Sequence, residues 1–501
     1  MKIRPFLDHH GIADNPFADE DAQTDVIFKG FCITSTYHPT WDKIYGNPAE
    51  PATAVVFGEK GSGKTALGLQ VVRHLTDYNA SHPAGKVFVI RYDDFNPYLD
   101  RYRERFSGRR RRVDKVLAQW KLWDHMDAIL ALGVTQLVDR ILGVKKVNHP
   151  AAVDGASLSF ESLDRSQARD VLLLAACYDQ STAEASLDRW RQLRRKLRLN
   201  CWKSMWDLGV GAAVTVIALG LFGWLALGES LSWKWAMILA GAAILAGWLP
   251  RLTRLVKWHW RAWSIKRSTR VLNQNTNMLR RCFMKIPERQ LIGQPLPAYD
   301  RTDDRYELLV KFQDVLRAMG FNGVVILVDR VDEPYLINGS AELMRMLLWP
   351  MLDNKLLKHP GVGFKLLVPA ELYYYVEREG REFHQRARLD KQNVVRSLDW
   401  TGQSLADVAD ARLKASSVPG RNPTLRALLD DSISDQRILD ALRSLRVPRH
   451  MFKFLYRLIV AHANAHTEER PSYRVSSETF EATLALYQRE LDSFDRSVGT
   501  V

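Results

Sequence analysis

The sequence has few of the residues that build disulfide frameworks or zinc sites. Its 501 residues include four cysteines, which are far apart and form neither a CxxC nor a His-paired pattern: Cys32, Cys177, Cys201 and Cys282. This spacing argues against a disulfide-stabilised secreted domain and favours a reducing compartment. The first ten residues contain Asp8, His9 and His10 where a secretory signal would have an apolar core, so no cleavable signal is predicted.

Acidic residues are absent from two basic stretches, residues 189–203 and 251–270. Each stretch carries seven Lys or Arg residues. Removing these fourteen from the 71 basic residues leaves 57, which equals the number of acidic residues. The net charge of +14 can therefore be assigned to these two stretches. Because the excess is so localised, it argues against a nucleic-acid partner, which would need a basic surface elsewhere.

Two apolar runs lie between the basic stretches. Leu208–Gly228 has 21 residues without a charge, which is long enough at about 1.5 Å per residue to cross a hydrocarbon core of about 30 Å. After the polar break at 228–232, a shorter run extends from Trp235 to Leu249 and meets Pro250. We predict a transmembrane hairpin over residues 204–250. The alternatives are a buried hairpin of a soluble core, and a second helix that is re-entrant or interfacial.

Tryptophan and small residues support the membrane interpretation. Ten of the 15 tryptophans lie in or beside the hairpin, and such belts with basic flanks are typical of a membrane–water boundary. The positive-inside rule predicts an inner-membrane protein with two crossings, both flanks and both termini cytoplasmic, and Glu229 outside. The small residues expected to let these helices, or neighbouring copies, pack closely are Gly220, Gly223, Ala240, Gly241, Ala243 and Gly247.

A glycine-rich loop is the strongest motif in the chain. It matches GxxxxGK[ST] and comprises Gly58, Glu59, Lys60, Gly61, Ser62, Gly63, Lys64 and Thr65. An apolar strand-like run, Ala54–Phe57, precedes it, and residues at helical spacing follow from Ala66. In this context the backbone N–H groups and the helix N-terminus favour a polyphosphate, Lys64 neutralises its β- and γ-oxygens, and the Thr65 hydroxyl ligates Mg²⁺. We predict an ATP site, with GTP as an open alternative.

An acidic cluster follows a second apolar strand. Residues 324–328 are all apolar and run into Asp329, which is placed to hold Mg²⁺ through water beside Thr65. A further acid is expected to orient or deprotonate the attacking water, and Asp332 and Glu333 both qualify. The structural alternative is that these acids cap the following loop.

Three more strand-like runs, residues 86–91, 364–368 and 393–396, complete a plausible parallel sheet. The predicted fold class is α/β: a P-loop NTPase sheet with a C-terminal helical lid and an inserted helical and transmembrane region. The predicted segments are 1–107 (first half of the core), 108–203 (helical insertion), 204–250 (hairpin), 251–303 (basic return helix and linker), 304–400 (second half of the core) and 401–501 (lid). Aromatic residues at 37–41 are expected to pack structurally, with contact to a base as the alternative.

These motifs resemble those of STAND and NACHT-type P-loop ATPases, whose Walker A and Walker B motifs are similar to 58–65 and 329–333. A transmembrane hairpin between the two motifs is similar to KAP-type P-loop ATPases. The resemblance implies that Arg449, in Val447-Pro448-Arg449, is a lid arginine that reaches the γ-phosphate. Arg330 stands where AAA+ motors have their catalytic glutamate, so rapid hydrolysis is not expected. For Arg412 we prefer a structural salt bridge over a trans-acting role.

The resemblance implies a membrane-tethered, ATP-dependent switch or assembly factor that hydrolyses ATP, in bacteria often in defence against phage. The expected partners are the lipid bilayer and either further copies of the chain or an effector protein. Two alternatives stay open. One is a membrane-attached motor or loader acting on nucleic acid, and the other is a nucleotide-binding scaffold with little hydrolysis.

Overall fold

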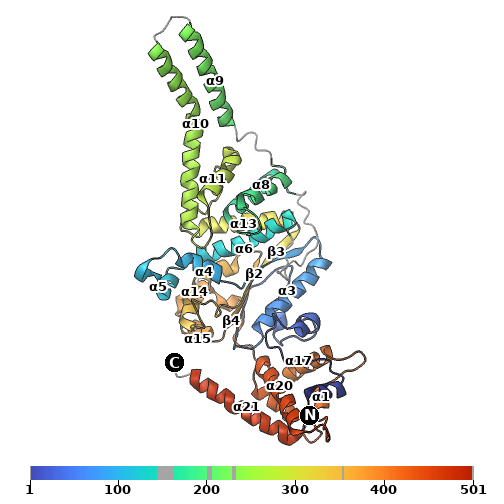
Figure 1. Ribbon diagram of the computed structural model, residues 1–501. Helices are drawn as coiled ribbons and strands as arrows, with labels where there is room; N and C mark the ends of the chain where they lie inside the picture. Colours follow the sequence, from blue (N-terminus) through green and yellow to red (C-terminus); the bar gives the residue numbers. More distant parts are fainter. Residues whose placement is uncertain (1, 145–162, 200–205, 228–232, 353–354, 499–501) are drawn as a thin grey trace. The chain divides into compact units, whose positions relative to one another are not determined.

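The computed structural model describes residues 2–144, 163–199, 206–227, 233–352 and 355–498. The chain is an α/β protein, largely helical, around a five-stranded parallel sheet (Figure 1). The strands are β1 (Ala54–Gly58), β2 (Lys86–Tyr92), β3 (Phe321–Val328), β4 (Val362–Pro369) and β5 (Asn393–Val395). Their order across the sheet is β2-β3-β4-β1-β5. The prediction of an α/β fold with a parallel sheet is confirmed.

The central strands are continuous apolar runs because both faces of the sheet are covered. Every residue of β1 and β4 is buried, as expected for parallel strands between helical layers. β1 pairs in parallel with β4 on one side and β5 on the other, and Gly58 lies opposite Pro369. Because the strands run the same way, the residues that follow β1, β3 and β4 emerge at one edge of the sheet.

The chain divides into two compact units that differ from the predicted segments. Unit 1 contains residues 1–81, 325–345 and 355–501, and unit 2 contains residues 82–324 and 346–354. The predicted insertion, hairpin and return helix therefore share one unit with β2. The predicted second half of the core, 304–400, begins with α13 (Asp303–Ala318), which packs against α6 and α7 inside unit 2.

Unit 1 has two hydrophobic cores. One lies under the sheet and includes residues of β1, β3, β4 and α3. The other joins the C-terminal helices to the N-terminal segment, including Phe6, Leu7, Ile12 and Phe17. The helices of this unit are α1 (Ile3–His9), η1 (Phe28–Cys32), α2 (Trp41–Tyr45), α3 (Lys64–Ser81), η4 (Lys355–Lys358), α15 (Glu371–Arg378), α16 (Arg381–Ala387), η5 (Leu389–Lys391), α17 (Gly402–Ala415), α18 (Leu425–Leu428), α19 (Asp435–Ser444), α20 (Pro448–Ala465) and α21 (Ser477–Val498). The N-terminus thus belongs structurally with the lid.

Unit 2 is a helical assembly held by buried ion pairs. Its helices are α4 (Asn96–Arg103), η2 (Gly108–Arg111), α5 (Val113–Leu117), α6 (Leu122–Leu142), α7 (Arg165–Tyr178), α8 (Ser186–Lys196), α9 (Trp206–Leu227), α10 (Trp233–Ser268), α11 (Thr276–Lys285), α12 (Glu288–Leu291) and α13; α14 (Ala341–Leu352) crosses between the units. Arg305 of α13 pairs with Asp127 of α6 at 3.0 Å, and Tyr178 of α7 donates to the same carboxylate at 2.9 Å. All three side chains are fully buried, so they specify how these helices pack.

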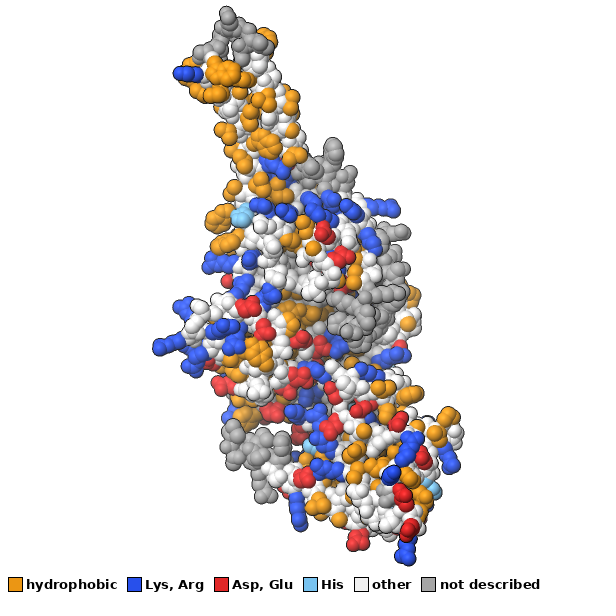
Figure 2. Space-filling view, viewed as in Figure 1, with side chains coloured by type: hydrophobic (Ala, Val, Ile, Leu, Met, Phe, Trp, Pro, Cys, Tyr) orange, Lys and Arg blue, Asp and Glu red, His pale blue; other side chains and the backbone are white. Residues whose placement is uncertain are grey.

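Helices α9 and α10 lie side by side and extend beyond the other helices of unit 2 (Figure 1). Both are long and apolar enough to cross a membrane, and few of their side chains are buried. Figure 2 shows the hydrophobic side chains on the surface of this hairpin. The predicted polar break and the Glu229 tip lie outside the described residues. The second apolar run ends at Pro250, but helix α10 continues through this proline to Ser268, so the second hairpin helix and the predicted basic return segment begin as one helix.

Two glycines set the contact between α9 and α10. A side chain at Gly247 would meet Val214 at 2.7 Å, and one at Gly211 would meet Trp248 at 3.0 Å. Three of the predicted packing glycines, Gly220, Gly223 and Gly241, instead have open space beside them. Small residues are therefore needed around Gly211 and Gly247, where α9 and α10 approach each other closely.

Candidate functional site

The loop between β1 and α3 forms the floor of a pocket in unit 1. Gly61 and Gly63 have φ values of +91° and +93°, a region that residues with a Cβ rarely adopt. α3 then begins directly at Lys64, so its N-terminal end faces the loop. These two glycines let the chain reverse between strand and helix within five residues, which gives the loop the local geometry predicted from its sequence.

Lys64 folds back over the loop. Its Nζ donates to the carbonyl oxygens of Gly58 at 2.8 Å and Glu59 at 2.9 Å. Burial lowers the pKa of Lys64, while the charges of Asp332 and Asp329 act in the opposite direction. The ammonium group is thus held at the carboxyl edge of the sheet among carboxylates, where an anionic ligand could draw it away from the two carbonyls.

Thr65 and Asp329 come together at this edge, as their sequence motifs predicted. Both residues line the pocket, and the Thr65 hydroxyl and the Arg330 backbone N–H act to lower the pKa of the Asp329 carboxyl. Asp329 is almost fully buried, and this burial raises its pKa to about 6. A cation placed beside this carboxylate would favour its ionised form and lower its pKa.

Asp332 and Glu333 both line the pocket, but their surroundings differ. Of the charged groups that act on Lys64, Asp332 contributes most. Glu333 is exposed and pairs with Arg330 at 3.2 Å. The backbone of Arg330 is in the left-handed region, with a φ of +57°. Arg330 therefore engages Glu333, which leaves Asp332 as the acid nearer the loop lysine.

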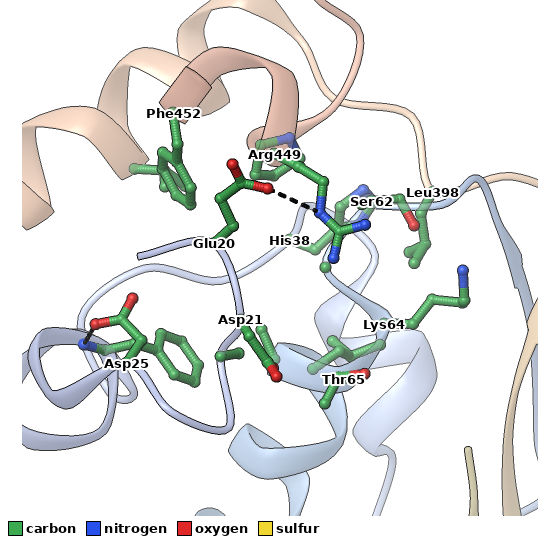
Figure 3. Close-up of a pocket in the computed structure, with 18 of the residues that line it drawn as sticks. Glu20, Asp21, Asp25, His38, Ser62, Lys64, Thr65, Leu398, Arg449 and Phe452 are labelled. Atoms are coloured by element: carbon green, nitrogen blue, oxygen red, sulfur yellow. Dashed lines mark hydrogen bonds and ion pairs between the residues drawn. The ribbon is translucent and has the colours of Figure 1, made fainter. Parts of the chain in front are cut away.

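Arg449, at the start of α20, packs directly on the glycine loop. Its backbone N–H donates to Gly61 O at 3.3 Å, and a Cβ on Gly61 would lie 2.7 Å from the Cβ of Arg449. Its Nε lies 3.8 Å from a carboxylate oxygen of Glu20, which also pairs with Lys453 at 3.4 Å (Figure 3). The lid arginine predicted by resemblance is thus next to the loop, and an acid of the N-terminal segment faces it.

Arg412 lines the pocket but is committed to structural contacts. It pairs with Asp25 at 2.6 Å, donates to Pro16 O at 2.7 Å and lies over the ring of Phe452 at 4.3 Å. Both charged side chains are almost completely buried. This geometry matches the salt bridge that we preferred from the sequence, and it leaves no guanidinium surface for a neighbouring copy.

Several pocket residues were not predicted. The N-terminal acids Glu20, Asp21 and Asp25 line it, as do His38 and Trp400. Trp400 donates from its indole N–H to Ser62 O at 2.9 Å. The signal for Trp400 was its place just after β5, at the same sheet edge as the loop. No pattern in the sequence predicted that the irregular N-terminal stretch would fold over the loop (Figure 3).

The aromatic residues at 37–41 behave as expected. Tyr37 and Trp41 pack with each other and with His74, and Tyr37 O–H lies 2.7 Å from His74 Nε2. Neither ring lines the pocket. The three cysteines in the described part of the chain, Cys32, Cys177 and Cys282, are buried free thiols.

Together these residues enclose a pocket of about 270 Å³. Basic side chains (Lys60, Lys64, Arg330 and Arg449) and acids (Glu20, Asp21, Asp329, Asp332 and Glu333) share its walls, and Phe28, Leu67, Val408 and Phe452 add apolar surface. Ser62 Oγ and Arg449 Nε are buried there without a hydrogen-bond partner. Orphaned polar groups of this kind are satisfied when a polar ligand binds.

Comparisons with known proteins add no assignment: no protein family, no curated protein and no solved structure matches the chain. The chemistry of the pocket therefore has to be judged from its own residues.

The oxygen atoms of Thr65 and Asp329 fit a hard divalent cation such as Mg²⁺. In the described part of the chain, no three His, Cys, Asp or Glu side chains are grouped so that they could hold a metal alone. This agrees with the behaviour of Mg²⁺, which is usually bound by one or two protein oxygens together with phosphate oxygens and water. The pocket can thus hold a phosphate chain and its cation together.

Proposed function

We propose that this pocket binds ATP with Mg²⁺ and that the chain is a membrane-anchored P-loop ATPase. The observation that carries the proposal is that Thr65, at the end of the glycine loop, and Asp329, at the end of β3, line one pocket at the same edge of the sheet. A phosphate-binding loop with a hydroxyl and a carboxylate beside it is the arrangement that phosphoryl transfer needs. The Ser62 hydroxyl, which has no hydrogen-bond partner, gives the same pocket unfilled polar capacity.

Each residue then has a role that follows from its position. Backbone N–H groups of the loop hold the phosphate chain, and Lys64 leaves the Gly58 and Glu59 carbonyls to neutralise it. Thr65 and Asp329 hold Mg²⁺, which when bound neutralises charge on the phosphate oxygens. Asp332 orients the attacking water, with Glu333 as the second candidate. Arg449 faces the terminal phosphate from the lid.

We infer slow hydrolysis and a switch-like role. Arg330 pairs with Glu333, so one of the two acids is already engaged. Arg449 lies at the start of α20, whose Met451 and Phe452 share a core with Phe6 and Phe17 of the N-terminal segment, so a ligand that attracts Arg449 would change contacts across that core. Differential affinity for ATP over ADP is what such a switch requires.

We further propose that α9 and α10 cross the inner membrane, with both termini in the cytoplasm. Their length, apolar composition and exposed side chains support insertion. Asp207 at the base of α9 pairs with Arg254 of α10 at 3.4 Å, which joins the two helices where they leave the apolar region. Basic flanks on both sides support a cytoplasmic base.

ATP turnover by the purified full-length chain in nanodiscs tests this function. We expect measurable, slow hydrolysis that is lost in Lys64→Ala and Asp329→Ala, whereas Lys414→Ala, an exposed change on α17, leaves it unchanged. Direct binding of a fluorescent ATP analogue separates loss of binding from loss of turnover. Binding that Lys64→Ala does not alter would refute a nucleotide site in this loop. If binding persists but turnover does not respond to Asp332→Ala with Glu333→Ala, the scaffold alternative is correct.

The role in phage defence follows only from the family resemblance. We propose it as a cellular role for the switch, with an effector protein or further copies as partners. Plaque counts on cells that carry the wild-type chain or Lys64→Ala test it: protection must depend on Lys64. A salt-sensitive complex of DNA or RNA with the hairpin-deleted chain would instead favour the loader alternative.

A further inference from the structure

The cytoplasmic half of α10 carries an exposed apolar stripe that continues from the membrane segment. Its residues recur every three or four positions: Leu245, Leu249, Leu252, Val256, Trp260 and Trp263. At 3.6 residues per turn they fall on one face of the helix. The buried residues of α10, among them Gly247, Arg254, Trp258 and Ile265, lie on the opposite face.

The length of α10 indicates where the C-terminal end of this stripe would lie relative to a bilayer. From Trp235 to Leu249 the helix rises only about 21 Å, which is short of a hydrocarbon core of about 30 Å. From Trp235 to Trp260 or Trp263 it rises about 38–42 Å, close to the thickness of about 40–45 Å that includes both headgroup layers. Because α10 is continuous through Pro250, its two tryptophan groups can occupy the two interfaces.

The charges along this part of α10 divide into two groups. Arg254 pairs with Asp207, Arg251 lies 4.0 Å from the same carboxylate, and Lys257 forms an ion pair with Glu288. Basic residues between Leu249 and Trp260 are therefore matched by acids, which lowers the cost of placing them near the apolar layer.

The basic residues beside the two lower tryptophans differ. Within the described part of the chain, Lys266 and Arg267 form no ion pair. Arg267 lies over the Trp263 ring at 5.6 Å, whereas Arg261 lies over the Trp258 ring on the opposite face of the helix. The Arg267 guanidinium is held beside an indole ring with its charge uncompensated, so an anion is the partner it lacks.

A neighbouring segment widens the surface. Ser264 of α10, which follows Trp263, donates to Ala298 O at 2.5 Å, and Lys257 of α10 pairs with Glu288, one turn before Ile292. The segment that carries Ile292 and Tyr299 therefore packs against α10. Trp260, Ile292 and Tyr299 are 66%, 65% and 63% exposed, and Trp263 is 46% exposed. Exposed aromatic and aliphatic side chains interleaved with unpaired cations are typical of a surface that enters lipid headgroups.

We infer that Trp260, Trp263, Ile292 and Tyr299, together with Lys266 and Arg267, form a face that binds the headgroups of anionic phospholipids. This lipid-binding face puts the cytoplasmic boundary of the membrane at Trp260–Trp263 and not at Pro250. The inference rests on membrane insertion of the hairpin, which is part of the proposed function. A second copy of the chain is the other occupant that an apolar stripe could take, but the uncompensated positive charge beside it disfavours a self-complementary contact.

Site-specific fluorescence on the full chain in nanodiscs tests the inference. An environment-sensitive label is placed at Trp260→Cys, Ile292→Cys, Leu245→Cys or the lid control Tyr456→Cys, all in a Cys201→Ser background, since Cys32, Cys177 and Cys282 are buried. Acrylamide reports exposure to water, and a nitroxide on the lipid headgroup reports contact with the interface. The nanodiscs contain phosphatidylcholine alone or with one quarter phosphatidylglycerol.

We expect the labels at 260 and 292 to be quenched by headgroup nitroxide and protected from acrylamide at least threefold relative to the label at 456. Phosphatidylglycerol should strengthen this contact, and the combined variant Lys266→Gln and Arg267→Gln should remove that difference between the two membranes. The label at 245 should be protected in every case.

Two outcomes overturn the lipid-binding face. In one, the labels at 260 and 292 are as open to acrylamide as the label at 456 while the label at 245 is protected. In the other, the labels at 260 quench one another at any ratio of lipid to protein, which assigns the stripe to a second copy. Exposure of the label at 245 refutes insertion itself, so failure of the hairpin and failure of this face give different results.

Discussion

The Thr65 hydroxyl and the Asp329 carboxylate meet in one pocket, where the hydroxyl acts to lower the pKa of the carboxyl, although 264 positions separate them in the chain. Most of unit 2, including both long apolar helices, is inserted between them. The contact forms because β1 and β3 belong to the same parallel sheet, with β4 between them. The chemistry proposed for the pocket depends on this contact more than on any other.

The raised pKa of Asp329, about 6, predicts how nucleotide binding depends on pH. Mg²⁺ requires the ionised carboxylate, so Mg²⁺-dependent ATP affinity should fall as pH decreases through about 6. The stability of the ligand-free fold should depend on pH in the opposite direction. The folded state holds this proton more tightly than the unfolded state, so Asp329 should destabilise the fold as pH rises from about 4 to about 6.

Calorimetric titration between pH 5 and pH 8 and thermal unfolding over pH 4 to pH 7 measure the two effects. Asp329→Asn is the control: its stability should lose this pH dependence, and its ATP affinity should be weak at every pH. Wild-type affinity that is constant between pH 5 and pH 8 would contradict a role for Asp329 as a cation ligand.

Asp332 and Glu333 should differ in their effect on turnover. Because Asp332 acts most strongly on Lys64 and Glu333 pairs with Arg330, we expect Asp332→Asn to lower kcat by about 10²-fold or more with little change in ATP binding. Glu333→Gln should change kcat by less than about tenfold. Single-turnover measurements with saturating ATP isolate the chemical step. The reverse order of the two effects would assign the water-orienting role to Glu333.

The sequence predicted the parts of this structure that depend on local patterns. All five strands lie where continuous apolar runs indicated, because both faces of the sheet are covered. The loop, Thr65 and Asp329 were predicted because strand ends and glycine spacing have fixed geometric consequences. The end of α10 was not, since Pro250 removes one hydrogen bond but the helix is held on both sides of it by contacts with α9 and α11.

The unpredicted half of the pocket depends on tertiary contacts. Glu20 and Asp25 belong to an irregular stretch whose position is set by Phe17 and its neighbours in the lid core, far along the chain. Trp400 follows a three-residue strand and reaches the loop through one indole hydrogen bond. No spacing within a single segment encodes such contacts, because both partners must first be folded.

The Glu20–Arg449 pair should oppose ATP binding. In this arrangement Glu20 competes with a terminal phosphate for the Arg449 guanidinium, which is about one third exposed. An exposed pair of this kind is weak, so Glu20→Gln should tighten ATP binding by about two- to fivefold and leave ADP binding nearly unchanged. Arg449→Ala should lower the preference for ATP over ADP. Fluorescence titrations with both nucleotides measure the ratio, and equal changes for ATP and ADP would argue against contact with the terminal phosphate.

Arg412 and Asp25 should act as a structural pair. Both side chains are buried and joined at 2.6 Å, so removing one partner leaves an uncompensated charge in the lid core. Arg412→Ala should therefore lower the stability of unit 1 by about 3–5 kcal/mol, and Arg412→Met, which keeps the packing over Phe452, should cost less when combined with Asp25→Asn. Thermal unfolding of the wild-type chain, Arg412→Met, Asp25→Asn and the double variant in nanodiscs measures the coupling free energy between the two residues. A trans-acting arginine predicts instead that Arg412→Ala folds normally and that mixing it with Lys64→Ala restores turnover. Because the guanidinium already contacts Asp25, Pro16 O and Phe452 within its own chain, we expect mixing to restore none.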